Sequence, residues 1–187
     1  MKRTLTFGAA VAACCVAAAP AWAAAAGYYY DGARKITVTP QKGLVAEFAR
    51  ADAKSAVKRA YPNAVELKAG VGGPRIYKAP AASFKPQTET GTFTSPVFRQ
   101  GTSPAGRLMA LPGGVIVTFK PEWTDAQVLA WVSARGYSVQ QRLNIQGHWY
   151  VLATPPGQAA LDAANTIHES REVLAASPNW WLETVTR

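Results

Sequence analysis

Apolar residues recur at regular intervals between Gly114 and Trp181, and they predict six elements of secondary structure. The expected order is strand, helix, strand, strand, helix, strand. The helices are expected between Thr124 and Gly136 and over 158–170, and the strands at 115–120, 137–143, 148–153 and 173–176. This order is a split βαβ pattern. The sequence therefore predicts a ferredoxin-like α+β fold, an antiparallel sheet with two helices on one face.

Alternation within the predicted strands assigns each side chain to one face of the sheet. The residues expected to face the helices are Val115, Val117, Phe119, Tyr137, Val139 and Leu143. The opposite face is then expected to carry Ile116, Thr118, Ser138, Gln140 and Arg142, with one side of the segment 149–152. Because both helices cover one face, the other is left open, and its aliphatic and polar groups make it a candidate docking surface.

Shorter apolar runs upstream predict a small α+β unit over residues 24–78. Asp31-Gly32 stands between two β-prone runs and predicts a hairpin. In its first strand, Tyr28 and Tyr30 are expected to pack and Tyr29 to face outward. The further elements expected in this unit are strands at 44–48, 65–67 and 75–77 and a helix at 51–60.

Two further segments connect this unit to the C-terminal pattern. Prolines among alanine, serine and threonine predict an extended linker over residues 79–96. A short hairpin formed by 97–99 and 108–111 is expected to open the C-terminal domain, 97–187.

The first 23 residues have the form of a secretory signal peptide. Lys2 and Arg3 precede a run rich in alanine and valine, and Ala21-Trp22-Ala23 supplies a cleavage site, so cleavage is expected before Ala24. The segment 24–26 offers a second site, and a lipoprotein signal ending at Cys14 is the alternative. The run is too short for a spanning helix. The sequence therefore predicts an exported chain, periplasmic or secreted, with no stable membrane span.

Composition and charge narrow the classes of function. Both cysteines, Cys14 and Cys15, lie in the signal, so the mature chain has no disulfide and no cysteine-based metal or redox site. The net charge of the whole chain is +9, but its basic residues are dispersed, which indicates a solvated basic surface rather than a nucleic-acid interface. His148 and His168 have no carboxylate at metal-ligand spacing. Neither a metal nor another cofactor is expected.

Two motifs in the C-terminal pattern resemble a known family. Gly114 to Pro121, Gly-Val-Ile-Val-Thr-Phe-Lys-Pro, resembles the opening strand of the prodomain of subtilisin-like serine proteases. Val173 to Trp180 matches that family's ending, Val-x-x-Ala-x-Pro-Asn-aromatic. The resemblance covers about seventy residues in the correct order and spacing, and the hairpin of tyrosines upstream extends it more weakly. It implies a ferredoxin-like domain without catalytic residues.

The segment 101–105 presents a rival interpretation. Gly-Thr-Ser-Pro-Ala resembles the nucleophile motif of the subtilisin-like proteases, which would make Ser103 catalytic. However, Arg107 stands where that motif has a proline, and the chain contains neither an Asp-x-Gly nor a His-Gly-Thr motif. A serine without a base is not activated. We therefore expect a turn at Ser103 and no enzymatic activity.

The resemblance also implies how the domain would act. In subtilase prodomains the open sheet face lies on two surface helices of the protease, and the segment after the last strand enters the substrate cleft. The corresponding tail residues here are Trp181, Leu182, Glu183, Thr184, Val185, Thr186 and Arg187. The expected partner is a subtilisin-like serine protease, with the chain acting as a freestanding inhibitor or folding chaperone. The alternatives are a cell-envelope or surface-binding module and a non-catalytic remnant or fragment of a protease precursor.

Overall fold

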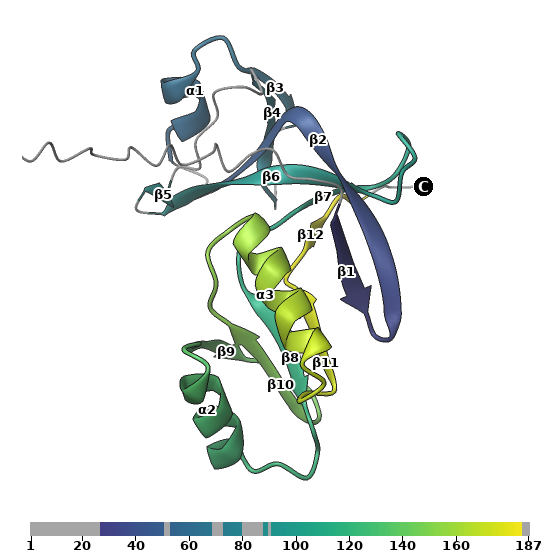
Figure 1. The fold of residues 1–187 in the computed structure, drawn as a ribbon. Helices are drawn as coiled ribbons and strands as arrows, with labels where there is room; N and C mark the ends of the chain where they lie inside the picture. The colour runs from purple at the N-terminus through teal and green to yellow at the C-terminus, as the bar shows by residue number, and fades with distance from the viewer. Residues whose placement is uncertain (1–26, 51–52, 69–72, 80–87, 90, 185–187) are drawn as a thin grey trace, which may run out of the picture.

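The computed structural model describes residues 27–50, 53–68, 73–79, 88–89 and 91–184 (Figure 1). Its helices are α1 (Ala56–Ala60), α2 (Asp125–Ala134) and α3 (Gln158–Glu169). The first six strands are β1 (Gly27–Asp31), β2 (Arg34–Ala49), β3 (Val65–Lys68), β4 (Arg75–Lys78), β5 (Thr88–Glu89) and β6 (Thr92–Gln100). The others are β7 (Leu108–Ala110), β8 (Val115–Phe119), β9 (Val139–Arg142), β10 (His148–Leu152), β11 (Ala175–Pro178) and β12 (Trp181–Leu182). The strands form two antiparallel sheets, so the α+β class is confirmed.

The first sheet, called sheet A, is organised around the long strand β2. Its strand order is β12-β7-β6-β2-β4-β3, with β1 pairing with β2 and β5 with β6. The pairing of β2 with β6 is interrupted between Pro40 and Val45, and Gly43 lies within this interruption with a φ of +76°. Glycine adopts that conformation without steric cost. On the N-terminal side of this interruption β2 pairs with β1 and β6, and on the C-terminal side it pairs with β4 and β6.

The expected linker is partly a strand of this sheet. Residues 80–87 and 90 lie outside the described part of the chain, but Thr92 to Pro96 form the first half of β6 and pair with the end of β2. Ser95 is fully buried, and its hydroxyl accepts a hydrogen bond from the Leu111 N–H at 3.0 Å. The composition of this stretch suggested an extended linker, whereas its long-range pairing with β2 makes it core structure. The expectation was therefore wrong for residues 92–96.

The tyrosines of β1 take the faces opposite to those expected. The turn at Asp31-Gly32 joins β1 to β2 as predicted, and Gly32 has a φ of +58°. Tyr29 is buried, with only 8% of its surface exposed, and it lies among Val38, Phe98 and Leu161. Tyr28 and Tyr30 are instead half-buried. The alternation of side chains between the two faces of β1 was predicted correctly. However, the sequence pattern could not show which of these faces packs against α3.

The second sheet, called sheet B, has the strand order β11-β8-β10-β9, and all its neighbours are antiparallel. Helices α2 and α3 lie between its strands along the chain, and one apolar core joins both helices to the same face of the sheet. This core includes Val115, Val117, Phe119, Val128, Trp131, Val132, Leu152, Ala164 and Ile167. The predicted order of elements and the predicted inward side of β8 are thus confirmed.

The ends of α2 follow the local sequence signals. The Thr124 hydroxyl accepts a hydrogen bond from the Gln127 N–H, and the Gln127 side chain accepts one from the Thr124 N–H at 2.8 Å, which completes a capping box. At the other end, Gly136 has a φ of +72°. These contacts satisfy backbone groups that a helix terminus leaves unpaired, so α2 begins and ends where the sequence predicted.

A β-bulge in β9 reverses the faces of two residues. Val139 pairs with Leu152, but the register then shifts, so that Gln141 pairs with Val151 and Arg142 with Tyr150. The extra residue moves every later side chain of the strand to the other face. Arg142 therefore lies on the helix side, although the uninterrupted alternation placed it on the open face. Leu143, expected under the helices, follows Arg142 and lies beside Trp149, whose carbonyl accepts its N–H.

A second apolar core joins the two sheets. It contains Tyr29, Val38 and Phe98 of sheet A together with Leu161 of α3. Trp180 follows sheet B and packs against this core, with its ring centroid 5.3 Å from that of Tyr29. Figure 1 shows β1 lying beside α3 and β12 returning to sheet A. The two units thus share a packed boundary.

Candidate docking surface

The open face of sheet B is built from two rows of side chains. Strand register places Thr118 between Trp149 and Ala175, and Ile116 between Val151 and Ser177. These residues alternate with Val115, Val117 and Phe119, which are buried under the helices. Ile116 and Thr118 therefore lie on the predicted face. The same register also places Trp149 on this face. The alternation of side chains within 148–152 is the feature of the sequence that could have identified it.

The centre of this face is apolar and partly shielded. Val151 is 6% exposed, whereas Ile116, Thr118 and Trp149 are half-buried. The surface therefore offers aliphatic and aromatic area beside a hydroxyl group.

Ser138 and Gln140 lie at the margin of the face. Ser138 is exposed just before β9, and its carbonyl accepts a hydrogen bond from the Ala153 N–H at 2.9 Å. The side-chain oxygen of Gln140 and the side chain of Val151 both lie beside Gly114, a position without a side chain. Gly114 has a φ of +86°, so a side chain at that position would be both strained and crowded. Gln140 thus extends the apolar centre with a polar amide.

Arg142 belongs to a different group of side chains. Its guanidinium donates to Asp125 Oδ2 at 2.6 Å, and the Tyr150 hydroxyl donates to Asp125 Oδ1 at 3.0 Å. His148 Nδ1 lies 3.2 Å from the same carboxylate. The hydrogen bond from Arg142, followed by that from Tyr150, lowers the pKa of Asp125 below its usual value. This cluster fixes the start of α2 to β9 and β10 and does not contribute to the open face.

The predicted tail is bound within the chain itself. Trp181 and Leu182 form β12, which pairs with Ala110 and Met109 of β7. Glu183 continues the pairing, since its N–H donates to the Leu108 carbonyl at 2.9 Å. The Glu183 carboxylate also forms an ion pair with Lys68 at 2.9 Å. These tail residues therefore do not form a free extended segment, which corrects the expectation for Trp181, Leu182 and Glu183.

The remainder of the tail is only partly described. Thr184 is exposed and lies beyond the last residue of β12. Val185, Thr186 and Arg187 lie outside the described residues. The unpaired part of the tail therefore begins at Thr184, whereas the sequence predicted an extended tail from Trp181 onward.

Ser103 lies in an exposed turn between β6 and β7. Its hydroxyl accepts a hydrogen bond from the Ala105 N–H at 3.2 Å, and its carbonyl accepts one from the Gly106 N–H at 3.0 Å. The two histidines have other neighbours: His148 lies beside Asp125, and His168 stacks on Tyr30 with ring centroids 3.9 Å apart. The local geometry of Ser103 is that of the predicted turn.

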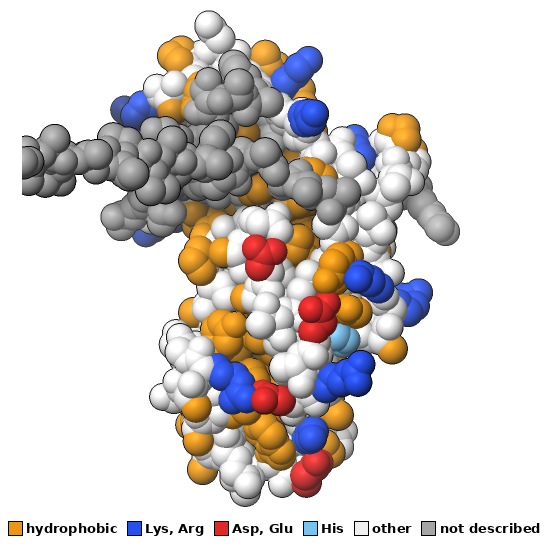
Figure 2. All heavy atoms as spheres, in the orientation of Figure 1, with side chains coloured by type: hydrophobic (Ala, Val, Ile, Leu, Met, Phe, Trp, Pro, Cys, Tyr) orange, Lys and Arg blue, Asp and Glu red, His pale blue; other side chains and the backbone are white. Residues whose placement is uncertain are grey.

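The described part of the chain also lacks two other kinds of site. Among those residues, no group of three or more histidine, cysteine, aspartate or glutamate side chains could hold a metal ion. None of the described helices is long and apolar enough to cross a membrane. Figure 2 shows basic and acidic side chains interspersed over the C-terminal unit on the face in view, rather than gathered in a patch of one sign.

Comparison with protein families, with curated proteins and with solved structures gives no match to this chain. The resemblance to subtilase prodomains therefore rests on the two sequence motifs.

Proposed function

We propose that residues 115–178 form a ferredoxin-like split βαβ domain that docks on a subtilisin-like serine protease and acts as its inhibitor or folding chaperone. The observation that carries this proposal is the position of the two motifs. The first spans β8 and the second spans β11, and these strands are neighbours in sheet B. Two segments about sixty residues apart in sequence thus meet in the one sheet that the resemblance implies.

The chemistry of the open face suits a protein partner. Ile116 and Trp149 supply apolar and aromatic area that is partly exposed, and Thr118 and Gln140 supply hydrogen-bonding groups. Interfaces between proteins combine such an apolar centre with a polar margin. Tryptophan is also among the residues that contribute most to binding when they are buried at the centre of an interface. We therefore place Trp149 and Ile116 at the centre of the contact.

The paired tail limits how the chain would reach a substrate cleft. While β12 stays paired with β7, only residues from Thr184 onward are available to enter the cleft. An extended segment binds such a cleft through backbone hydrogen bonds. The proposed mechanism therefore has two parts, in which the open face of sheet B docks and the segment 184–187 blocks the cleft.

Titration of a subtilisin-like protease with variants of this chain tests both parts. Trp149→Ala should weaken direct binding by about 2 kcal/mol or more, because it removes the largest side chain of the proposed contact. Leu129→Ala is the matched control, since Leu129 is 51% exposed on α2, a helix on the opposite side of sheet B. Deleting 184–187 should preserve binding but weaken inhibition of peptide hydrolysis.

The two measurements separate the parts of the proposal. Equal binding by wild type and Trp149→Ala would exclude the open face as the docking surface. Full inhibition by the shortened chain would exclude the tail from the cleft while leaving the docking surface in place. No binding by the wild-type chain to any subtilisin-like protease tested, including one produced by the same cell, would overturn the proposed function.

A further inference from the structure

The described part of the tail lies on sheet A, whereas the proposed docking face lies on sheet B. β12 pairs with β7, and Trp181 packs half-buried against the apolar core on one face of sheet A. Ile116 and Trp149 belong to β8 and β10 of sheet B. Docking by that face and blocking by the segment 184–187 act together only if the start of the tail has a defined place relative to the docking face.

The two edges of sheet A meet at the tail. β3 and β12 stand at opposite ends of the strand order, yet Lys68 of β3 forms an ion pair with Glu183, just after β12, with 2.9 Å between Nζ and Oε1. The Glu183 N–H donates to the Leu108 carbonyl at 2.9 Å, and Glu183 Oε2 accepts from the Leu108 N–H at 3.4 Å. Glu183 is thus held by β7 on one side and by β3 on the other, where sheet A curls back on itself.

Gly73 makes room for the tail beside this ion pair. A side chain at position 73 would place its Cβ only 2.7 Å from Trp181 Nε1, closer than two non-bonded atoms can stand. The Lys68 ammonium also lies 5.7 Å from the centroid of the Trp181 ring, within the range of a cation–π contact. We call Lys68, Gly73 and Leu108 the tail seat. Its members come from β3, from the segment before β4 and from the start of β7.

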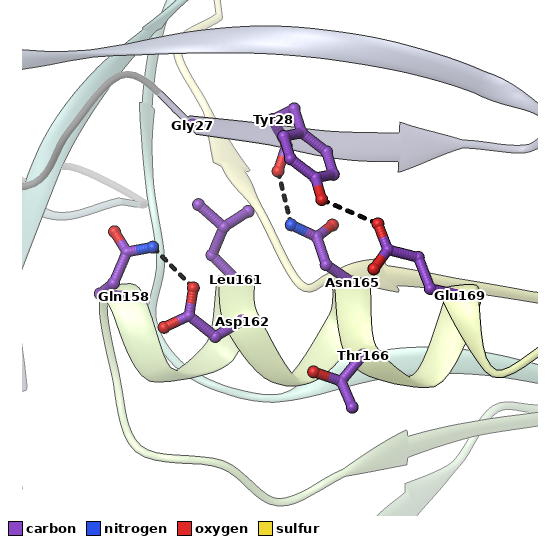
Figure 3. Close-up of a pocket in the computed structure, with 8 residues that line it drawn as sticks. All are labelled: Gly27, Tyr28, Gln158, Leu161, Asp162, Asn165, Thr166 and Glu169. Carbon is purple, nitrogen blue, oxygen red and sulfur yellow. Dashed lines mark hydrogen bonds between the residues drawn. The ribbon is translucent and has the colours of Figure 1, made fainter.

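Contacts between β1 and α3 fix the tail seat relative to the docking face. The Tyr28 hydroxyl donates to Glu169 Oε1 at 2.7 Å, and Asn165 Nδ2 donates to the Tyr28 carbonyl at 2.8 Å (Figure 3). The apolar core that joins the two sheets includes Tyr29 of β1 and Leu161 of α3. Helix α3 packs in turn on sheet B. The seat on sheet A and the face of sheet B are therefore parts of one packed body.

We propose that Lys68 and Gly73 are positioning residues for the segment 184–187, so that the N-terminal unit orients the blocking part of the chain. This inference rests on the proposed function. Loss of the seat would leave the tail unpaired from Trp181 onward, and a longer flexible tether lowers the effective concentration of its end at a cleft. A seated tail has also lost part of its conformational entropy before the protease binds. The seat therefore strengthens inhibition although its residues are not part of the docking face.

The first test measures the seat in the free chain by hydrogen exchange. Lys68→Glu places a second carboxylate beside Glu183, so protection of the amide of residue 183 should fall about fivefold or more. Gly73→Ala displaces the Trp181 indole and should have the same effect. Lys68→Glu combined with Glu183→Lys restores opposite charges and should restore protection. Lys78→Glu is the matched control, since Lys78 is an exposed lysine on the neighbouring strand β4.

The second test measures inhibition and docking separately. The variants that lose protection should inhibit a subtilisin-like protease about threefold to tenfold less well, and the charge-exchanged pair should inhibit like the wild type. All of them should bind with wild-type affinity to the same protease when a covalent peptide inhibitor occupies its cleft, because the open face of sheet B is unchanged. Lys78→Glu should match the wild type in both measurements.

The outcomes separate this inference from the proposed function. If the wild type binds and inhibits, but variants with an unprotected residue 183 inhibit equally well or better, the positioning role is overturned and the proposed function stands. Unchanged protection in both Lys68→Glu and Gly73→Ala also overturns it, because the seat then does not hold the tail. Equal losses of docking and inhibition would show a general structural effect and overturn it as well. A wild-type chain that neither binds nor inhibits overturns the inference together with the proposed function.

Discussion

The two sheets differ in how far apart along the chain their paired strands lie. Sheet B is assembled from segments within residues 115–178. Helix α2 follows β8, helix α3 follows β10, and both helices pack on the same face of the sheet. Sheet A joins strands from both ends of the described chain, and β12 pairs with β7 some seventy residues earlier. The periodicity of a segment indicates which face is buried, but it carries no information about a distant partner. Local pattern therefore described sheet B well and sheet A poorly.

The cores show the same difference. The core of sheet B contains side chains from one continuous region and is closed by α2 and α3. Sheet A is packed on both faces: Val45 and Tyr77 contact Val57 on the side of α1, whereas Ala46 and Ile76 pack with Trp181 on the other. Trp180 and Trp181 thus connect the end of the C-terminal unit to sheet A. Substitutions can show whether the two regions unfold together.

Phe119→Ala should have the largest effect. Phe119 is 1% exposed, and its ring lies 5.3 Å from Trp131 and 5.8 Å from Tyr150. Removing a buried aromatic side chain costs about 3–5 kcal/mol, a large part of the roughly 5–15 kcal/mol that stabilises a domain. Thermal and urea unfolding should show a strongly destabilised sheet B. Leu129→Ala serves as the control, and a melting temperature close to that of wild type would contradict the assigned strand faces.

Trp180→Ala should have an intermediate effect and act on the boundary between the regions. The indole packs against Tyr29 and Phe98, whose centroids lie 5.3 and 5.6 Å away, but it is only half-buried. We expect a cost of about 2–3 kcal/mol, below that of a fully buried tryptophan. Hydrogen exchange should show loss of protection in β7 and β12 before α2 and β10. Equal loss of protection throughout would show that the two sheets unfold as one cooperative unit.

Asp125→Asn should have the smallest effect on the free energy of unfolding, and this effect should depend on pH. The bonds from Arg142 and Tyr150 lower the pKa of Asp125 below the ordinary value of 3.8. A carboxylate whose pKa is lower in the folded state stabilises that state above the unfolded pKa, and loses this contribution as the pH falls through the folded value. The difference in unfolding free energy between wild type and Asp125→Asn should therefore shrink below about pH 3.8.

Urea titrations between about pH 6 and pH 2 measure this difference. Glu122→Gln, a similar loss of charge at an exposed position, is the control and should follow the wild type more closely. A difference between wild type and Asp125→Asn that is independent of pH would show that the Asp125 cluster contributes packing rather than charge.

The sequence by itself determined features that depend on near neighbours. Thr124, Gln127 and Gly136 set the ends of α2 because caps are local hydrogen bonds, and Asp31-Gly32 set the first hairpin for the same reason. The alternation of Val115, Val117 and Phe119 predicted their burial, since one face of a strand beneath two helices must be apolar. The element order within 115–178 and two residues of the candidate face, Ile116 and Thr118, followed from these signals.

Only the tertiary structure decided the features that depend on distant partners. One extra residue in β9 moved Arg142 to Asp125, and the bulge has no signature in an alternating pattern. Residues 92–96 became a core strand because β2 pairs with them, although their composition is that of a linker. Trp181 to Glu183 joined sheet A because β7 offered an unpaired edge and Lys68 an opposite charge. Two distant segments of the chain gain pairing energy only when the fold brings them side by side. The periodicity of each segment does not show which other segment will be its partner.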